Sequence, residues 1–524
     1  MRFKAIFITC VCTLLILTAC STKPPTDAPL VLSLGAEPSM LNPILSTDST
    51  SSSVNGYIFN GLLKVNPDLE LVPDLAQSYQ VSADGLTFTF TLKPNITWHD
   101  GTPFSTEDIL FTYQRILDTT TNTVRRSDYI INGQPIEIMV IDSQTIQFKL
   151  PTAFAPILNR FTMGIIPKHI FENEDINTSA YNQNPIGTGP FTFTRWEPAQ
   201  FVLLKRNPNY FDTLPKLKTV LLKIIPDQNT ALISFEKEEV YSAGIPGKDF
   251  ERIKQVETFN TFQFYDLAYT FLGFNCKNPL FESPVLRQAI AMSINKQSIV
   301  DGILLGYGKP AHLPTSPEMW TYPKTHFNYD YNPQQALTQL QQAGFKYDAQ
   351  NNILYKDNQP VTFKIITNKG NKDREKAAVM IQDNLKNIGI KVAVQLMEWS
   401  SFIAVVNANQ DPKDYDAVIL GWSLGLDPDG YSLWHSSQYP QGFNFVGYQN
   451  EQVDQWLHAG RTTIDRDQRK VIYANLYNEI AQDAPYVFLY YPESLVGIHR
   501  KVTGLSPAGP AGLFNPIENI FITQ

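Results

Sequence analysis

The sequence predicts an α/β protein with more than one domain. Its 524 residues and 59.2 kDa exceed the size at which a single hydrophobic core stops growing. Hydrophobic residues make up 43% of the chain and aromatic residues 12%, which is enough for large cores and an aromatic-lined cleft. Segments with strand periodicity alternate with segments with helix periodicity, and this mixture indicates several layers, in an α/β or α+β arrangement.

The first residues, "MRFKAIFITCVCTLLILTAC", are typical of a secretion signal. Arg2 and Lys4 precede an apolar run that is too short to span a membrane stably. The run ends in "LTAC", which resembles the lipobox of bacterial lipoproteins, so Cys20 is the expected site of lipidation. An ordinary cleaved signal with an incidental cysteine is the alternative. Residues 1–19 are therefore the predicted signal peptide, and the polar, Pro-rich residues 20–29 the lipidated tether.

Charge and cysteine content exclude several classes of function. Loss of Arg2 and Lys4 changes the formal net charge from −8 to −10, and a mildly acidic protein is not suited to nucleic acid. With Cys10 and Cys12 in the signal and Cys20 lipidated, Cys276 is the only ordinary cysteine. An internal disulfide and a thiolate metal cluster are therefore not expected.

The first strand–helix pair lies early in the chain. "GLTFTFTLKP" alternates apolar residues with threonine from Leu86 to Leu92, which predicts a half-buried strand. "STEDILFTYQRIL" follows, with Ser105 as the expected N-cap, acidic residues in the first turn, and one apolar stripe formed by Ile109, Tyr113 and Ile116.

Further helices and strands are predicted in the second half. A helix should begin at Ser283 and Pro284, and another spans residues 374–388 until Gly389 ends it. A strand with Val392, Val394 and Leu396 on one face then completes an αβ unit. Finally, residues 469–484 predict a helix that Pro485 ends, followed by the buried strand "YVFLYY".

No enzymatic motif is recognisable. The chain lacks H-E-x-x-H, P-loop and Rossmann patterns, and its seven histidines have no spacing that would chelate a metal from one helix face. We therefore expect no catalysis, no metal and no cofactor.

The stretch "DYDAVILGWSLGLDPDGYSLWHSSQ" (414–438) combines carboxylates with aromatic residues. As a calcium loop it fails, because the required ligand, glycine and glutamate positions hold Tyr431, Ser432 and Gln438. Asp427 and Asp429 could supply a carboxylate pair, but no nucleophile or oxyanion donor accompanies them. An Asp-Pro-Asp-Gly turn is one remaining interpretation. The other is a ligand cradle, in which a tryptophan wall and a carboxylate meet a peptide ammonium.

Several stretches together resemble one family, the extracellular solute-binding proteins, family 5, which bind oligopeptides or dipeptides for ABC importers. The similar segments cover nearly everything after residue 30; they are "GAEPSMLNP", "FNGLLKVNPDLELVPDLAQSYQVSADGLTFTFTLKPNITWHDGTPFSTEDILF", "NPIGTGPF", "LGFNCKNPLFESPVLRQAIAMSINKQSIV" and "GWSLGLDPDGYSLWHS". The resemblance implies a periplasmic-binding-protein-like fold (type II, cluster C), with two lobes that close over a ligand, an extra domain and a two-segment hinge.

The resemblance also implies domain boundaries. Residues 28–62, 185–268 and 486–524 would form lobe I, with the extra domain at 63–184 inserted into it, and residues 269–485 would form lobe II. The crossing segments would lie near Tyr269–Asn275 and Asp483–Tyr491.

By the same resemblance, one set of residues is expected to contact the ligand: Glu37, Tyr269, Phe271, Trp422, Leu424, Gly425, Asp427, Asp429 and Tyr491. Relatives that bind a free peptide N-terminus carry an aspartate three residues after the tryptophan, and this chain has Gly425 there. Either Asp427 or Asp429 replaces it, or the amine is not recognised in this way. Backbone pairing with an extended peptide needs no particular side chain.

The sequence thus predicts a monomeric lipoprotein, held by its lipid on the periplasmic side of a bacterial membrane or the outer face of the plasma membrane. It would bind peptides and deliver them to the permease subunits of an ABC transporter. A non-peptide ligand on the same scaffold, such as an oligosaccharide or a metal chelate, is the first alternative. A lipid-anchored peptide hydrolase is the second.

Overall fold

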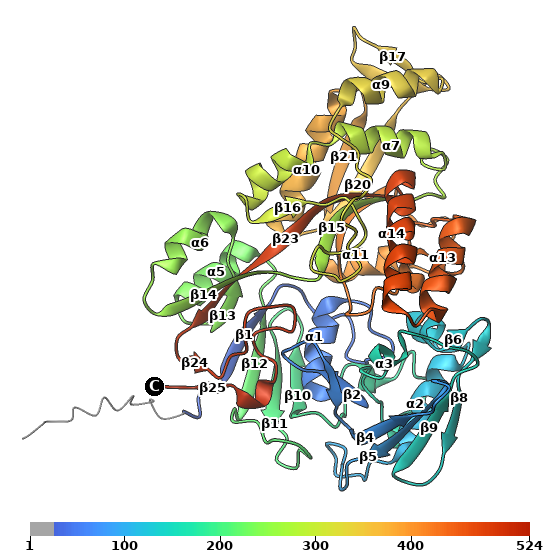
Figure 1. The fold of residues 1–524 in the computed structure, drawn as a ribbon. Helices are drawn as coiled ribbons and strands as arrows, with labels where there is room; N and C mark the ends of the chain where they lie inside the picture. Colours follow the sequence, from blue (N-terminus) through green and yellow to red (C-terminus); the bar gives the residue numbers. More distant parts are fainter. Residues whose placement is uncertain (1–25) are drawn as a thin grey trace, which may run out of the picture.

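The computed structural model describes residues 26–524, and a four-stranded sheet organises its N-terminal part. β1 (Leu30–Leu34) pairs in parallel with β12 (Thr219–Ile224). β12 pairs antiparallel with β11 (Phe201–Arg206), and β11 pairs antiparallel with β10 (Phe191–Glu197). α1 (Ser49–Ile58) packs beside β10, and the side chain of Asp48 caps its first turn. Because the backbone N–H of Thr26 donates to the carbonyl of Ile522, the start of the described chain lies beside its end (Figure 1).

A second antiparallel sheet lies in residues 63–184, in the order β4 (Ala76–Val81), β5 (Thr87–Leu92), β9 (Thr145–Lys149) and β8 (Glu137–Val140). The predicted alternation in β5 is confirmed, since Phe88, Phe90 and Leu92 are buried. α2 (Thr106–Leu117) begins after a capping box in which Ser105 and Asp108 satisfy each other's backbone N–H groups.

The largest sheet has eight strands and joins both lobes. Its main path is β13 (Ser242–Gly244), β23 (Tyr486–His499), β15 (Ala268–Phe274), β22 (Ala417–Ser423), β20 (Thr362–Asn368) and β21 (Lys391–Met397). β14 (Phe259–Tyr265) and β16 (Gly308–Pro310) also pair with β23. The predicted αβ unit is confirmed as α10 (Lys372–Lys386) followed by β21, with Gly389 at φ +78° between them.

Two segments cross between the lobes (Figure 1). β14 and β15 are separated only by Asp266 and Leu267, and β23 runs past both strands without a break. The predicted strand 486–491 is therefore the first part of a longer one. β23 continues through Pro492, although proline has no N–H to donate to a strand pair. Pro492 lies opposite Gly308 of the short strand β16.

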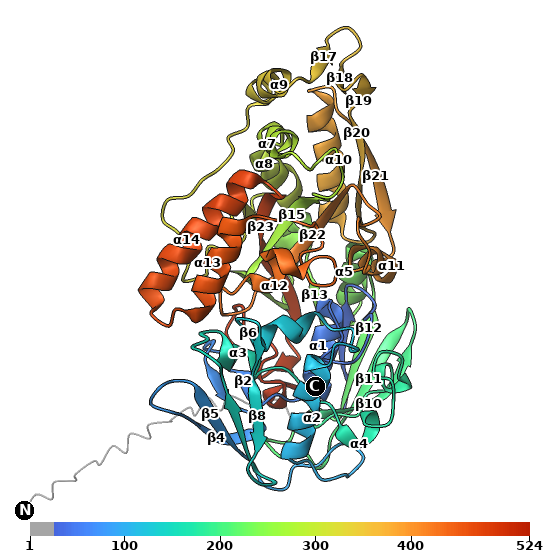
Figure 2. The same cartoon turned by 90° about the vertical axis from the view of Figure 1, so that its right-hand side faces the viewer.

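Helices cover lobe II, and some of them face the elements of lobe I and its extra domain. α7 (Pro284–Ser293) begins as predicted, with Ser283 as N-cap and Pro284 in the first turn. Figure 2 shows α12 (Tyr431–Trp434) and α13 (Glu451–Thr462) above α3 (Ile157–Arg160) and β6 (Ile130–Ile131) of the other lobe, with α14 (Arg466–Asp483) alongside α13.

The remaining elements are short or peripheral: β2 (Leu63–Val65), β3 (Leu71–Pro73), η1 (Val124–Asp128), β7 (Gln134–Pro135), α4 (Lys168–Phe171), η2 (Ala180–Asn182), α5 (Gln228–Glu236), α6 (Gly247–Lys254), α8 (Lys296–Ile299), η3 (Val300–Leu304), α9 (Pro333–Gln342), β17 (Lys346–Asp348), β18 (Ile353–Lys356), β19 (Gln359–Pro360), α11 (Trp399–Val406), η4 (Ser436–Gln438), β24 (Val502–Thr503), η5 (Ile517–Asn519) and β25 (Phe521–Ile522).

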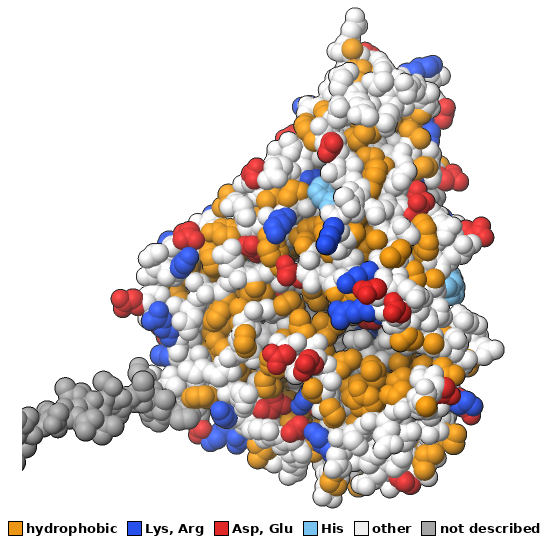
Figure 3. Space-filling model, viewed as in Figure 1, with side chains coloured by type: hydrophobic (Ala, Val, Ile, Leu, Met, Phe, Trp, Pro, Cys, Tyr) orange, Lys and Arg blue, Asp and Glu red, His pale blue; other side chains and the backbone are white. Residues whose placement is uncertain are grey.

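Surface charge is mixed. On the face seen in Figure 3, lysine and arginine side chains are interspersed with aspartate and glutamate. Within residues 26–524, no helix is long and apolar enough to cross a membrane, and no group of three or more His, Cys, Asp or Glu side chains is placed to hold a metal ion.

Candidate ligand cleft

A cavity of about 760 Å³ lies between the two lobes, a volume within the usual range for ligand sites. Both lobes line it, together with the crossing residues Asp266, Leu267 and Ala268. The other contributing residues come from these segments: 43–69, 125–129, 159–164, 423–427 and 510–515.

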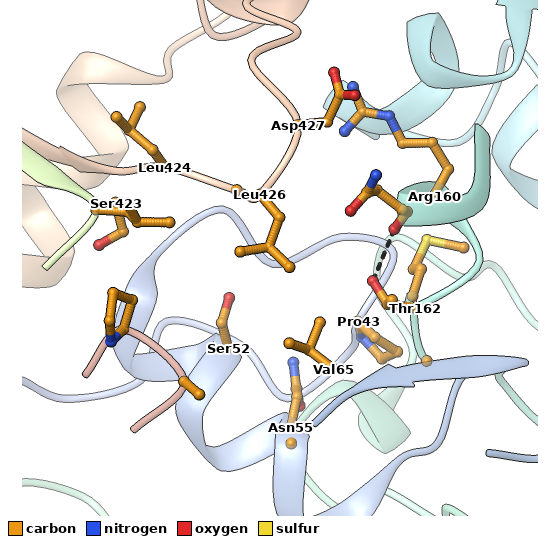
Figure 4. Close-up of a pocket in the computed structure, with 18 of the residues that line it drawn as sticks. Pro43, Ser52, Asn55, Val65, Arg160, Thr162, Ser423, Leu424, Leu426 and Asp427 are labelled. Carbon is orange, nitrogen blue, oxygen red and sulfur yellow. Dashed lines mark hydrogen bonds between the residues drawn. The ribbon is translucent and has the colours of Figure 1, made fainter. Parts of the chain in front are cut away.

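The loop after β22 forms one wall. β22 and β15 pair up to Ser423 and Ala268, and the N–H of Leu424 continues the ladder by donating to the carbonyl of Leu267 at 2.6 Å. Beyond that point, the backbone N–H groups of Gly425 and Leu426 make no hydrogen bond within residues 26–524. Figure 4 shows the side chain of Leu426 projecting toward Ser52 and Val65.

Asp427 and Asp429 both have arginine partners. Arg469 holds the two oxygens of Asp427 at 2.8 and 2.9 Å. Asp429 is buried deeper and accepts from Nε of Arg461 at 3.0 Å and from Nη2 of Arg160 at 2.6 Å. Burial alone would raise the pKa of Asp429, but the guanidinium groups of Arg461 and Arg160 hold it well below its usual range. Asp427 lines the cavity, where it lies beside Arg160 (Figure 4), and Asp429 does not line it.

Leu424 and Gly425 line the cavity, but the predicted aromatic contacts do not. Tyr269 and Phe271 are fully buried in a stack of rings, in which Phe271 lies 3.8 Å from Tyr486 between ring centroids. Trp422 packs on the same stack, 6.5 Å from Phe271, and its indole N–H donates to the hydroxyl of Tyr486 at 3.4 Å. Tyr269, Phe271 and Trp422 belong to one hydrophobic cluster, against which Leu424 of the loop also packs. They therefore contact the loop on the side away from the cavity.

Tyr491 and Glu37 lie elsewhere. Tyr491 is buried, and its hydroxyl is hydrogen-bonded to the N–H and carbonyl of Leu313. Glu37 accepts from the indole of Trp196 at 3.1 Å and lines a separate hollow of about 390 Å³. Cys20 lies outside the described residues.

Sequence reasoning missed much of the lining. Ser52, which is exposed, and Asn55, which is buried, come from α1; Arg125 and Arg160 come from residues 63–184, and Asp266 from the crossing. No local pattern marks these positions, since each is an ordinary polar residue until the fold brings it to the cleft.

Comparison with known proteins decides what kind of cleft this is. The model of the bacterial extracellular solute-binding proteins, family 5, matches residues 70–444. The chain belongs to this family. The predicted resemblance and the periplasmic-binding-protein fold are both confirmed.

Similar proteins bind different solutes. The oligopeptide-binding protein AppA of Bacillus subtilis is 33% identical over 504 residues, which cover 94% of this chain and 91% of AppA. The structure of AppA in complex with a nonapeptide matches at a TM-score of 0.91, with 32% identity, covering 96% of this chain and 100% of that one. NikZ of Campylobacter jejuni in complex with Ni(L-His) matches at a TM-score of 0.85, with 26% identity, covering 95% of this chain and 100% of NikZ.

Family membership establishes the general role. As a member of family 5, this protein is an extracytoplasmic solute-binding protein that works with an ABC importer. Proteins of this family bind and release solutes without catalysis, which excludes the peptide hydrolase.

Proposed function

We propose that this protein binds peptides in the cleft between its lobes and delivers them to the permease subunits of its ABC importer. The observation that carries the proposal is the unpaired backbone of Gly425 and Leu426 at the cavity wall. An extended peptide can continue the β15–β22 ladder there and use its own N–H and carbonyl groups as partners. The likeness to AppA over nearly the whole chain supports the same ligand class.

The lobes are proposed to open and close around the ligand. Asp266 and Leu267 are the only residues between β14 and β15, and the second crossing is made by β23 alone. Two narrow connections are the usual construction of a hinge. Small-angle scattering should show a smaller radius of gyration at saturating peptide, and an unchanged radius would contradict hinge closure.

Mass spectrometry of the native protein tests the ligand class directly. Protein purified from its own host should release peptides, and the masses should be unchanged after prolonged incubation, since the protein does not hydrolyse them. Recovery of a non-peptide solute in place of peptides would overturn the proposal.

A metal chelate is the competing ligand class, because NikZ shares the fold and binds Ni(L-His). Metal analysis of the same purified sample separates the two. Nickel at one equivalent per chain, lost together with histidine on denaturation, would favour the chelate.

We further propose that Cys20 carries the lipid that holds the protein at the membrane. The polar residues 21–29 would keep the folded body clear of the bilayer. Cys20→Ala should release soluble protein or leave uncleaved precursor. If the variant were processed and membrane-bound like the wild type, Cys20 would not be the site of the lipid.

A further inference from the structure

The charged groups that line the cleft are unevenly paired. Five carboxylate or guanidinium side chains reach the cavity: Arg125, Asp128, Arg160, Asp266 and Asp427. Asp128 forms an ion pair with Arg160 at 3.1 Å, and Asp427 is held by both terminal nitrogens of Arg469. Arg125 donates to the carbonyls of Pro43 and Ser46. Asp266 forms no ion pair with any residue from 26 to 524.

The position of Asp266 follows from the strand register. Ala268 pairs with Ser423, and Leu267 receives the next hydrogen bond from Leu424. One residue further along the same antiparallel ladder, Asp266 is level with Gly425. A Cβ added at Gly425 would meet no atom within 4 Å, so open space adjoins this point of the wall. Asp266 therefore stands where the unpaired backbone of the loop begins.

The carboxylate of Asp266 is oriented but its charge is not compensated. The hydroxyl of Ser494, on the crossing strand β23, donates to one of its oxygens. Burial raises the pKa of Asp266, which means that the site penalises the ionised form. A cation brought by a ligand would remove that penalty and would form a charge-assisted hydrogen bond.

We infer that Asp266, and not Asp427 or Asp429, receives a primary ammonium group of the ligand. The inference rests on the proposed peptide-binding function and specifies how the cleft orients its ligand. A peptide whose amino group meets Asp266 would have its following residues beside Gly425 and Leu426. Two sources of a primary ammonium fit this chemistry, the N-terminus of a peptide and a lysine side chain.

The test uses a digest of short peptides in three forms: with free N-termini, with N-termini and lysines acetylated, and with only N-termini acetylated. Wild-type protein, stripped of ligand by unfolding and refolding, is incubated with an equal mixture, and retained peptides are quantified by mass spectrometry. We expect about a tenfold or greater preference for free amines over fully acetylated peptides, as one charge-assisted hydrogen bond provides. The third form shows whether a lysine can replace the N-terminus.

Asp266→Asn should abolish that preference while peptides are still retained. The matched control is Glu318→Gln, which removes the same charge from an exposed position that does not line the cavity, and it should keep the preference. Ser494→Ala, which leaves the charge in place but removes the orienting hydroxyl, should reduce the preference; it serves as the second variant if Asp266→Asn folds poorly by circular dichroism.

The outcomes separate the two claims. If wild type retains peptides but ignores acetylation, or if Asp266→Asn keeps the full preference, the role of Asp266 is refuted and the peptide-binding function stands. If wild type retains none of the three forms, the peptide-binding function itself fails and the inference fails with it.

Discussion

Arg160 and Asp429 form an ion pair across the cleft, with 2.6 Å between Nη2 and Oδ2. Arg160 ends α3 in the first lobe, and Asp429 lies in the loop after β22 of the second. The same aspartate is also bound by Arg461, whose Nη1 donates to the carbonyl of Ser127 in the first lobe. This buried network connects the two lobes without any contribution from a ligand.

Arg160→Gln should weaken the closed state. Asp429 would keep Arg461 as a partner, so we expect the protein still to fold. The closed state should lose about 1–3 kcal/mol of stability relative to the open state, which is less than the cost of leaving a buried charge without any partner. Scattering from the ligand-free variant should show a larger radius of gyration than the wild type. Arg195→Gln, which removes an exposed arginine on β10, is the control and should leave the radius unchanged.

Gly187→Ala should be strongly destabilising. A Cβ at this position would lie 1.9 Å from the carbonyl oxygen of Ile58 at the end of α1, and backbone cannot move aside cheaply. We expect a loss of about 3 kcal/mol or more in the free energy of unfolding, measured by denaturant titration. Gly35→Ala adds a Cβ with no atom within 4 Å and should be tolerated. Equal stability of the two variants would refute this packing argument.

Local patterns predicted local structure well. The caps at Ser105 and Ser283, the alternation in β5 and the glycine after α10 all depend on residues within a few positions of each other. The strand at 486 was predicted too short, because its continuation depends on pairing with β14, which lies more than 200 residues earlier in the chain.

The partners of the charged site could not be predicted from the sequence. Asp427 and Asp429 look like free carboxylates in a turn, yet Arg469 is 42 residues away from Asp427 and Arg160 is 269 residues away from Asp429. Nothing near either aspartate in the sequence indicates these pairings. Asp266 shows the converse: its neighbours suggest no role, and only the strand register brings it beside Gly425.

Trp422→Ala should affect stability more than ligand contact. The indole stacks on Phe271 and Phe445, with ring centroids 6.5 and 5.7 Å apart, and it does not line the cavity. Removing this half-buried ring should cost about 3 kcal/mol of unfolding free energy, because a void would open behind the loop. Trp422→Phe retains most of the stack and should recover more than half of the loss. A Trp422→Ala protein with wild-type stability but weakened binding would instead make the tryptophan a direct ligand contact.

Stability should fall in acid partly through His99. Its Nδ1 accepts from the N–H of Gly187 at 3.2 Å, and its Nε2 lies 3.1 Å from the carbonyl of Gly189, so the ring fits as the neutral Nε2–H tautomer. Burial lowers the pKa of His99 from 6.5 to about 4 in the folded protein. Between these values the unfolded chain binds the proton more readily, so the contribution of His99 decreases as pH falls from 6.5 to about 4 and is constant above 6.5. The loss should reach about 2–3 kcal/mol at the acid end.

His99→Gln replaces the ring with a side chain that does not titrate and can still donate and accept. Unfolding free energies measured at intervals across this pH range should show a shallower decrease than in the wild type. Some decrease should remain, because burial also lowers the pKa of His312, to about 3, and that shift has the same sign. Parallel pH profiles for the variant and the wild type would show that His99 is protonated as easily in the folded protein as in the unfolded chain.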